Sequence, residues 1–143
     1  MTHILEAGLE FMDSNNPDNL PKVKGYNIIN GQLTSSSDGS TFISKNPAVL
    51  ADELGEFPLS TRDDVHAAIA AARSALTDWA ATPAPTRGQI IGNMGRLLME
   101  YKEDLVRLQA REIGKTLKEC GGEIQEAIDT CLFFQSEGRR LYG

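Results

Sequence analysis

The sequence predicts an α+β chain, with β hairpins in its first part and three amphipathic helices in its second. The first observation is a pair of turn dipeptides, Asn30-Gly31 and Asp38-Gly39, set between short β-prone runs. The second is a change of pattern at residue 60, after which apolar residues recur every three or four positions. We therefore expect an N-terminal extension with a short helix (1–24), a β-hairpin segment (25–59) and a helical part (60–143).

The strands are placed by the turns between them. Asn-Gly between apolar residues is the strongest short-range hairpin signal, so YNIINGQLTSS is expected to fold back on itself around Asn30-Gly31. SSSDGS supplies a second turn, and TFISKNP and ELGEFPL have the composition of two further strands. Together these runs predict one small β meander.

Capping signals mark the start of the first helix. Ser60 or Thr61 is expected to cap it, with Asp63 and Asp64 in the first turn, where the helix dipole favours negative charge. Its apolar stripe consists of Val65, Ile69, Ala72 and Leu76. Trp79, near its end, is expected to be a packing anchor.

Two more helices are expected after Pro83 and Pro85. Thr86 is the expected cap of the second helix, which is interrupted near Glu103-Asp104 and ends at Gly114. The third is expected to begin near Thr116 and to run to about Leu141. Its predicted apolar face consists of Leu117, Cys120, Ile124, Ala127, Ile128, Cys131 and Leu132, followed by Phe133 and Phe134.

The composition excludes several classes of function. A net charge of -6 over 143 residues argues against binding to nucleic acids or anionic membranes, because both require a cationic surface. No apolar run approaches the length that spans a membrane. The N-terminus lacks the basic start and long apolar stretch of a secretory signal.

The two cysteines are expected to be structural. Cys120 and Cys131 lie in one predicted helix, about 16 Å apart along its axis, which is too far for a disulfide. Both fall on the apolar stripe, where a thiol behaves as a small hydrophobic group rather than as a nucleophile. Two unpaired cysteines favour a cytoplasmic location.

The densest cluster of charge lies in EIGKTLKECGGEIQEAID, residues 112–129. Glu119, Glu123 and Glu126 share one helix face, which we interpret as a solvent-facing or partner-facing stripe. A carboxylate metal centre stays open as an alternative, although such helical sites usually include histidine, and the chain has only His3 and His66. His66 is interpreted as a helix-surface or packing residue.

Three smaller features in this region also have structural explanations. Gly121-Gly122 lies within a helix and matches no phosphate-binding motif, so close helix–helix contact is the expected reason for it. Lys115 follows a helix end, where a cation is favoured by the dipole. From the residues alone, no catalytic constellation emerges.

A series of short motifs in residues 25–143 nevertheless occurs in a distinctive order. They are INGQ at 29–32, NP at 46–47, Pro58-Leu59 before an Asp-Val helix start, an Ala-Ala-Ala-Arg run leading to Trp79, a proline-rich opening with Arg87, Glu112-x-Gly114-Lys115, Gly122-Glu123-Ile124 and Asp129. In this order they resemble the N-terminal segment of the NAD(P)-dependent aldehyde dehydrogenase superfamily. PAPTRGQI and EIGKTLKECGGEIQEAIDTC are most similar to its amino-acid semialdehyde members, such as the aminoadipic semialdehyde type.

The resemblance implies a segment of the α/β aldehyde dehydrogenase fold, from which the cofactor-binding sheet and the catalytic domain are absent. The family's nucleophilic cysteine follows Gly-Gln and its general base lies in Glu-Leu-Gly-Gly, whereas in this sequence neither cysteine follows Gly-Gln and Glu-Leu-Gly-Gly does not occur. No catalytic or cofactor-binding role is therefore assigned to Cys120 or Cys131. The intact enzyme is expected to use NAD or NADP, to form a cysteine thiohemiacetal, to transfer hydride to the nicotinamide and to hydrolyse the resulting thioester. The 143-residue chain alone is expected to hold no cofactor and to be inactive.

One minor family feature has matching residues in this chain, with a purely structural role for them as the favoured alternative. Some members hold a monovalent cation through main-chain oxygens before Asn-Pro and an acid before Gly-Lys, and the matching residues are Ser44, Lys45 and Glu112. The expected partners are the remainder of the dehydrogenase chain and, in the intact enzyme, further copies of itself, with no nucleic acid and no membrane. The alternative function is a free-standing helical interaction module derived from that family.

Overall fold

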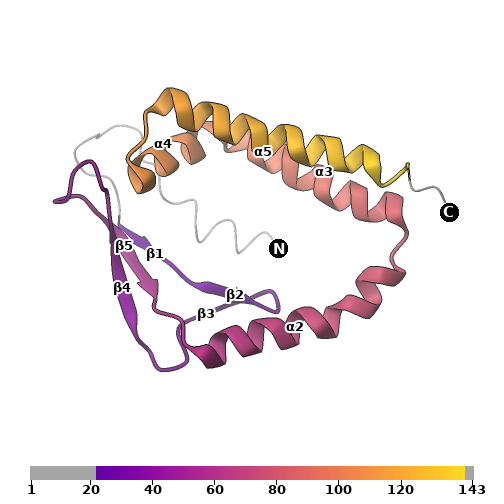
Figure 1. The fold of residues 1–143 in the computed structure, drawn as a ribbon, viewed down its shortest axis with the longest axis horizontal. Coiled ribbons are helices and arrows are strands. Elements are labelled where there is room, and N and C mark those ends of the chain that lie inside the picture. The colour runs from indigo at the N-terminus through magenta and orange to yellow at the C-terminus, as the bar shows by residue number, and fades with distance from the viewer. Residues whose placement is uncertain (1–21, 141–143) are drawn as a thin grey trace. The chain divides into compact units, whose positions relative to one another are not determined.

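The computed structural model describes residues 22–140, so the predicted N-terminal helix lies outside the described residues (Figure 1). The chain divides into two compact units, Met1–Ser74 and Ala75–Gly143. Helix α2 (Arg62–Ala81) begins in the first unit and ends in the second. In the described part of the chain, no helix combines the length and the apolar character needed to cross a membrane.

The first unit contains two small sheets. The larger sheet has the order β1-β5-β4, in which β1 runs parallel and β4 antiparallel to the central strand β5. The other sheet is the antiparallel pair β2-β3. The bounds are β1 Val23–Lys24, β2 Asn27–Ile29, β3 Gln32–Thr34, β4 Thr41–Lys45 and β5 Glu53–Pro58. Leu54, which is 1% exposed, is the most deeply buried apolar residue of this unit.

The predicted hairpin at Asn30-Gly31 is confirmed. Both residues have positive φ, 52° for Asn30 and 72° for Gly31, as a two-residue turn of type I′ requires. Asparagine and glycine tolerate this left-handed backbone better than other residues. The turn fixes the register in which Ile29 faces Gln32.

The prediction of a single continuous meander is wrong, because β3 and β4 belong to different sheets. The serine-rich turn between them forms hydrogen bonds with the start of α2 and does not continue the pairing of β2 and β3 into β4. The Ser37 N–H donates to Asp64 Oδ1 at 3.0 Å, and the Ser36 hydroxyl donates to Asp64 Oδ2 at 3.3 Å. Strand β1 had no sequence signal, because it has two residues and pairs with a distant strand.

Asp64 is the central residue of this polar network, and it also completes the cap of α2. The Thr61 hydroxyl accepts from the Asp64 N–H at 3.4 Å, while Asp64 Oδ2 accepts from the Thr61 N–H at 2.7 Å. Thr61 is therefore the capping residue, one of the two candidates that the sequence offered. Asp64 is only 8% exposed, and the N–H of Thr61, more than any other group, holds its pKa below the ordinary value.

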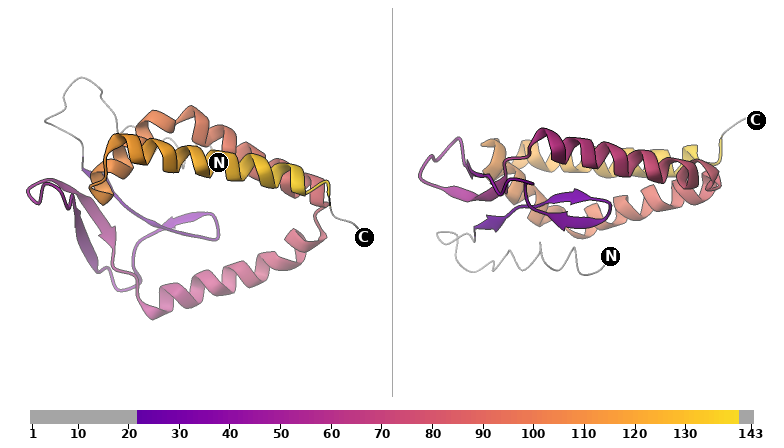
Figure 2. Two further views of the ribbon diagram at one scale, coloured as in Figure 1. Left: turned by 45° about the horizontal axis from the view of Figure 1, so that its top comes forward. Right: turned by 90° about the horizontal axis from the view of Figure 1, so that it is seen from below.

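The second unit is built from α3 (Ala84–Glu100), α4 (Lys102–Ile113) and α5 (Leu117–Glu137), together with the end of α2. Helices α3 and α5 lie side by side in every view (Figures 1 and 2). They run antiparallel, because Gly138 lies against Ala84 while Gly95 lies against Cys131.

Several details of these helices differ from the expectations. The predicted second helix is two helices, α3 and α4, separated at Tyr101 rather than at Glu103-Asp104. Thr86 does not cap α3, because the helix begins earlier, with Pro83 as its N-cap residue and no side-chain capping bond. Helix α5 ends at Glu137, four residues before the predicted end, where Gly138 takes the C-cap position.

Glycines on α3 allow it to approach α5 closely. A Cβ on Gly88 would lie 2.6 Å from the main-chain oxygen of Gln135, and one on Gly95 would lie 2.9 Å from the Cβ of Cys131. Gly92 is covered by the Gln135 side chain, 2.1 Å from where its Cβ would be. All three glycines are buried. Their spacing therefore sets the distance between the two helices.

The described residues do not supply the helix–helix contact that was expected at Gly121-Gly122. Among the described residues, no atom comes within 4 Å of the position that a Cβ would take on either glycine. The close contacts instead involve the glycines of α3, whose pattern the sequence analysis did not single out.

We expect Gly88→Ala to destabilise the chain by about 1–3 kcal/mol, because its methyl group meets main chain that cannot rotate away. Gly92→Ala is expected to have a smaller effect, since the Gln135 side chain can move. Urea denaturation would measure the change in the free energy of unfolding for both variants. Gly121→Ala is the matched control and should stabilise the chain by about 0.5–1 kcal/mol, because it enters open space within a helix. Equal effects at Gly88 and Gly121 would contradict the packing described for α3.

We also expect the contribution of Asp64 to depend on pH. Because its pKa is lowered in the folded state, the carboxylate stabilises the fold at neutral pH, and this contribution is lost as pH falls through the lowered pKa. Asp64→Asn should therefore be clearly destabilising at pH 7 and close to neutral in strong acid. Denaturation curves at both pH values would show the change. Asp63→Asn, at the exposed neighbour, is the control.

Candidate functional site

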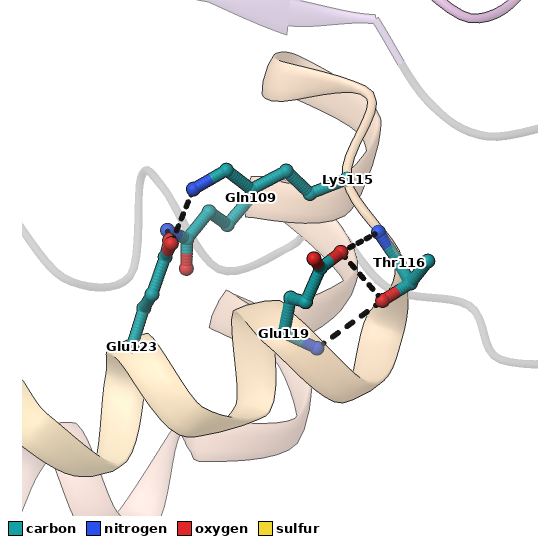
Figure 3. Close-up of polar contacts among 5 residues, drawn as sticks. All are labelled: Gln109, Lys115, Thr116, Glu119 and Glu123. Atoms are coloured by element: carbon teal, nitrogen blue, oxygen red, sulfur yellow. Dashed lines mark hydrogen bonds and ion pairs between the residues drawn. The ribbon is translucent and has the colours of Figure 1, made fainter.

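The junction between α4 and α5 concentrates the polar contacts of the second unit (Figure 3). Helix α4 ends at Gly114, whose φ of 75° is left-handed and whose N–H donates to Ala110. Helix α5 begins after Thr116, whose hydroxyl accepts from the Glu119 N–H at 3.3 Å. Glu119 Oε2 in turn accepts from the Thr116 N–H at 3.2 Å and from its hydroxyl at 2.8 Å. Both predicted ends, Gly114 and Thr116, are confirmed.

Glu123 links the two helices across this junction. One carboxylate oxygen accepts from the Gln109 amide on α4, and the other pairs with Lys115 in the connecting turn. Figure 3 shows Gln109 and Lys115 converging on this carboxylate from the same side. The side-chain amide oxygen of Gln109, Oε1, is buried and has no hydrogen-bond partner among the described residues.

The acidic stripe therefore has three separate roles. Glu119 closes the capping box of α5. Its pKa is lowered most by the hydrogen bond from the Thr116 hydroxyl and next by the bond from the Thr116 N–H. Glu123 binds Gln109 and Lys115 within the chain and still keeps 37% of its side chain accessible, so the expectation of a solvent-facing side chain holds for it only in part. Glu126 is exposed, as predicted. A shared helix face could not reveal this division, because it depends on partners outside α5.

Lys115 has a more specific role than the expected dipole interaction. Its hydrogen bond and charge interaction with Glu123 raise its pKa above the ordinary value. The pair is partly exposed, with 44% of the Lys115 side chain and 37% of the Glu123 side chain accessible. Its contribution to stability is present below the ordinary lysine pKa and is lost as pH rises through the raised one.

The residues expected to bind a monovalent cation lie in separate units. Ser44 and Lys45 are the last two residues of β4, and Glu112 is in the last turn of α4. The ladder between β4 and β5 is irregular at Ser44/Lys45. The described residues contain no group of three His, Cys, Asp or Glu side chains that could hold a metal ion. The cation site stays a prediction.

Both cysteines pack as predicted. Cys120 is fully buried and Cys131 is 5% exposed, and neither forms a disulfide. Cys131 lies against Gly95 at the α3–α5 contact. His66 is exposed on α2, in agreement with its interpretation as a surface residue.

The helical pair of the second unit borders two open grooves. The first, of 580 Å³, lies between α3 and α5 and is mainly apolar, with Ile91, Met94 and Phe134 among its lining residues. Trp79 also lines it, 40% exposed, with the Arg87 guanidinium 6.0 Å from its ring centre. The second, which we call the outer α5 groove, has a volume of 470 Å³ and is lined by Gly122, Gln125, Glu126, Asp129, Thr130, Phe133 and Phe134.

The glycine pair does not fit a dinucleotide site. Such sites place glycines in a loop between a strand and a helix N-terminus, so that main-chain N–H groups face the phosphates. Gly121 and Gly122 instead lie inside α5, where their N–H groups point along the helix. At this junction, the described residues hold helices together and do not assemble a reacting centre.

Residues 33–143 match the aldehyde dehydrogenase family. The chain belongs to this family. It is 40% identical, over 116 residues, to an NADP-dependent succinate-semialdehyde dehydrogenase from Escherichia coli, covering 81% of this chain and 24% of the relative. It is 36% identical, over 117 residues, to an α-ketoglutarate semialdehyde dehydrogenase from Haloferax volcanii, covering 82% of this chain and 24% of the relative.

The fold agrees with this assignment. A crystal structure of an NAD-dependent aldehyde dehydrogenase from Sinorhizobium meliloti superposes with a TM-score of 0.82 at 28% identity. The superposition covers 92% of this chain but only 26% of that one. The chain thus has the fold of part of an aldehyde dehydrogenase, and it spans about a quarter of the length of the relatives it matches.

We expect Glu123→Gln to lower the Lys115 pKa towards its ordinary value, because it removes the negative partner that raises it. An NMR titration of the lysine side chains would measure this shift. Glu126→Gln, on the same helix and exposed, is the control and should leave the Lys115 titration unchanged. The same shift in both variants would show that the overall charge of α5, not the specific pair, controls Lys115.

Proposed function

We propose that this chain is the N-terminal portion of an NAD(P)-dependent enzyme that oxidises an aldehyde or semialdehyde to the acid. The family match over residues 33–143 carries the proposal. The identity to semialdehyde dehydrogenases supports a semialdehyde as the substrate class. The choice of an aminoadipic type semialdehyde rests only on motif similarity in PAPTRGQI and EIGKTLKECGGEIQEAIDTC.

The reacting groups are proposed to belong to the remaining polypeptide of the intact enzyme. Cys120 and Cys131 are buried and follow no Gly-Gln motif, so neither is assigned as the nucleophile. A nicotinamide cofactor supplies the hydride acceptor when it is bound. Related proteins include an NADP-dependent and an NAD-dependent enzyme, which supports either cofactor for the whole protein. This chain would supply the outer strands and the helices that brace the cofactor domain.

The same proposal includes a structural monovalent cation held by main-chain oxygens of Ser44 and Lys45 and by the carboxylate of Glu112. The irregular ladder at Ser44/Lys45 supports it, because a local break in pairing leaves main-chain oxygens available as ligands. A cytoplasmic location is proposed from the free cysteines. Assembly of the intact enzyme into a homo-oligomer follows from the family resemblance.

The free-standing module is the second candidate, and it has one observation in its favour. Large apolar side chains in the second unit remain exposed, including Met94 at 49% and Phe134 at 54%. An uncovered apolar face of this kind marks a surface that binds something. The same observation suits a portion that packs on the rest of an enzyme, so function must be tested directly.

The test is a fusion in which the 143-residue chain replaces the matching quarter of the Escherichia coli succinate-semialdehyde dehydrogenase. We expect the fusion to reduce NADP when succinate semialdehyde is added, because this chain supplies the missing part of the fold. The absorbance of the reduced nicotinamide measures the rate. The 143-residue chain alone, with NAD or NADP and a set of aldehydes, is the control and should give no turnover.

Two results would contradict the proposal. Turnover by the chain alone would place the chemistry within these 143 residues. An inactive fusion, combined with a chain that is a cooperatively melting monomer by size-exclusion chromatography, would favour the free-standing module.

A further inference from the structure

The outer α5 groove contains a glycine that the described chain does not explain. Gly122 is exposed inside α5, and within residues 22–140 no atom approaches within 4 Å of its missing Cβ. Glycine is less stable than alanine in a helix interior, because its backbone loses more freedom on folding. It is the residue that leaves room where another main chain comes close. At Gly88 and Gly95 that neighbour is α5, whereas at Gly122 it is missing.

The rest of the groove has the character of a contact surface. Phe133 and Phe134 are 57% and 54% exposed, and their rings meet edge to face with centroids 5.3 Å apart. Asp129 and Glu126 line the same groove, about one and two helical turns before Phe133. Large exposed aromatic side chains beside carboxylates suit an apolar segment that carries a lysine or arginine.

We infer that the outer α5 groove seats the remaining polypeptide of an aldehyde dehydrogenase, with a main-chain segment of that polypeptide passing over Gly122. This inference rests on the proposed function. The matched residues cover only 24% of the succinate-semialdehyde dehydrogenase. Most of such an enzyme is therefore available to cover the groove. The covered surface of this chain is thus the outer α5 groove, and the group that approaches Gly122 is main chain of the remaining polypeptide.

Two alanine substitutions test the inference as a matched pair. Gly121 and Gly122 are neighbours in α5 and both lack atoms within 4 Å, but only Gly122 lines the groove. In the 143-residue chain, Gly121→Ala and Gly122→Ala should each raise Tm by about 2–6 °C, through helix propensity alone. In the fusion with the Escherichia coli enzyme, Gly121→Ala should keep its gain. Gly122→Ala should instead lower Tm by about 2 °C or more, because its methyl group meets the seated main chain.

Calorimetry on four variant proteins, two chains and two fusions, therefore decides the inference. Equal shifts for the two substitutions in the fusion would overturn it. A lower Tm for Gly122→Ala in the chain alone would also overturn it, since the glycine would then serve packing within the chain. The inference would fail equally if the unsubstituted fusion melted in two independent transitions, or if the chain formed a dimer that only Gly122→Ala dissociated.

Failure of the proposed function would look different. A fusion that melts as one cooperative unit but does not oxidise succinate semialdehyde would count against the proposed activity. The comparison between Gly121→Ala and Gly122→Ala would still decide whether the groove is covered.

Discussion

The second unit depends on the close approach of α3 and α5. The contact is made where side chains are missing, at Gly88, Gly92 and Gly95, so main chain of one helix lies against the other. Dispersion forces weaken steeply with distance, and a helix pair without bulky side chains between its axes gains many such contacts. The buried Cys131 and Ile128 lie at this seam. At the junction with α4, the contacts of Glu123 with Gln109 and Lys115 tie α4 and the connecting turn to this helix pair.

The incomplete burial of α5 agrees with the proposed function. A helix is usually covered along its apolar stripe, because burial of apolar surface is the main driving force for folding. In the described chain only Cys120, Ile128 and Cys131 of α5 are buried, while Phe133 and Phe134 at its end are more than half exposed. The proposal that this chain is a portion of a longer aldehyde dehydrogenase would account for the exposure, since the succinate-semialdehyde dehydrogenase is about four times as long as the match.

Local chemistry allowed much of the fold to be predicted from the sequence. Asn30-Gly31 and Gly114 adopt left-handed backbone, and Thr61 and Thr116 cap the helices that follow them, so each acts within four residues of its own position. The burial of Cys120 followed from helical periodicity. These features depend on neighbours in the chain, which a single sequence displays directly.

The errors involved contacts between distant residues. The expected contact at Gly121-Gly122 is not made within the described chain, because a glycine shows that space is needed but not where its neighbour lies. The separation of β3 from β4 depends on Asp64, which lies 27 residues from Ser37. The binding of Glu123 by Gln109 and Lys115 depends on how α4 turns into α5. The order of the motifs in the sequence was enough to indicate the family. The candidate site could not be predicted in the same way, because it depends on which residues of α4 and α5 contact each other.

The capping contacts between Thr61 and Asp64 at the start of α2 also have a consequence for local dynamics. One carboxylate receives N–H groups from both Ser37 and Thr61, so the serine-rich turn and the first turn of the helix share a single acceptor. Opening of either segment removes a bond from the other, which couples their fluctuations. The amide protons of Ser37 and Thr61 should therefore become accessible to solvent in the same opening event, although the two residues are 24 positions apart.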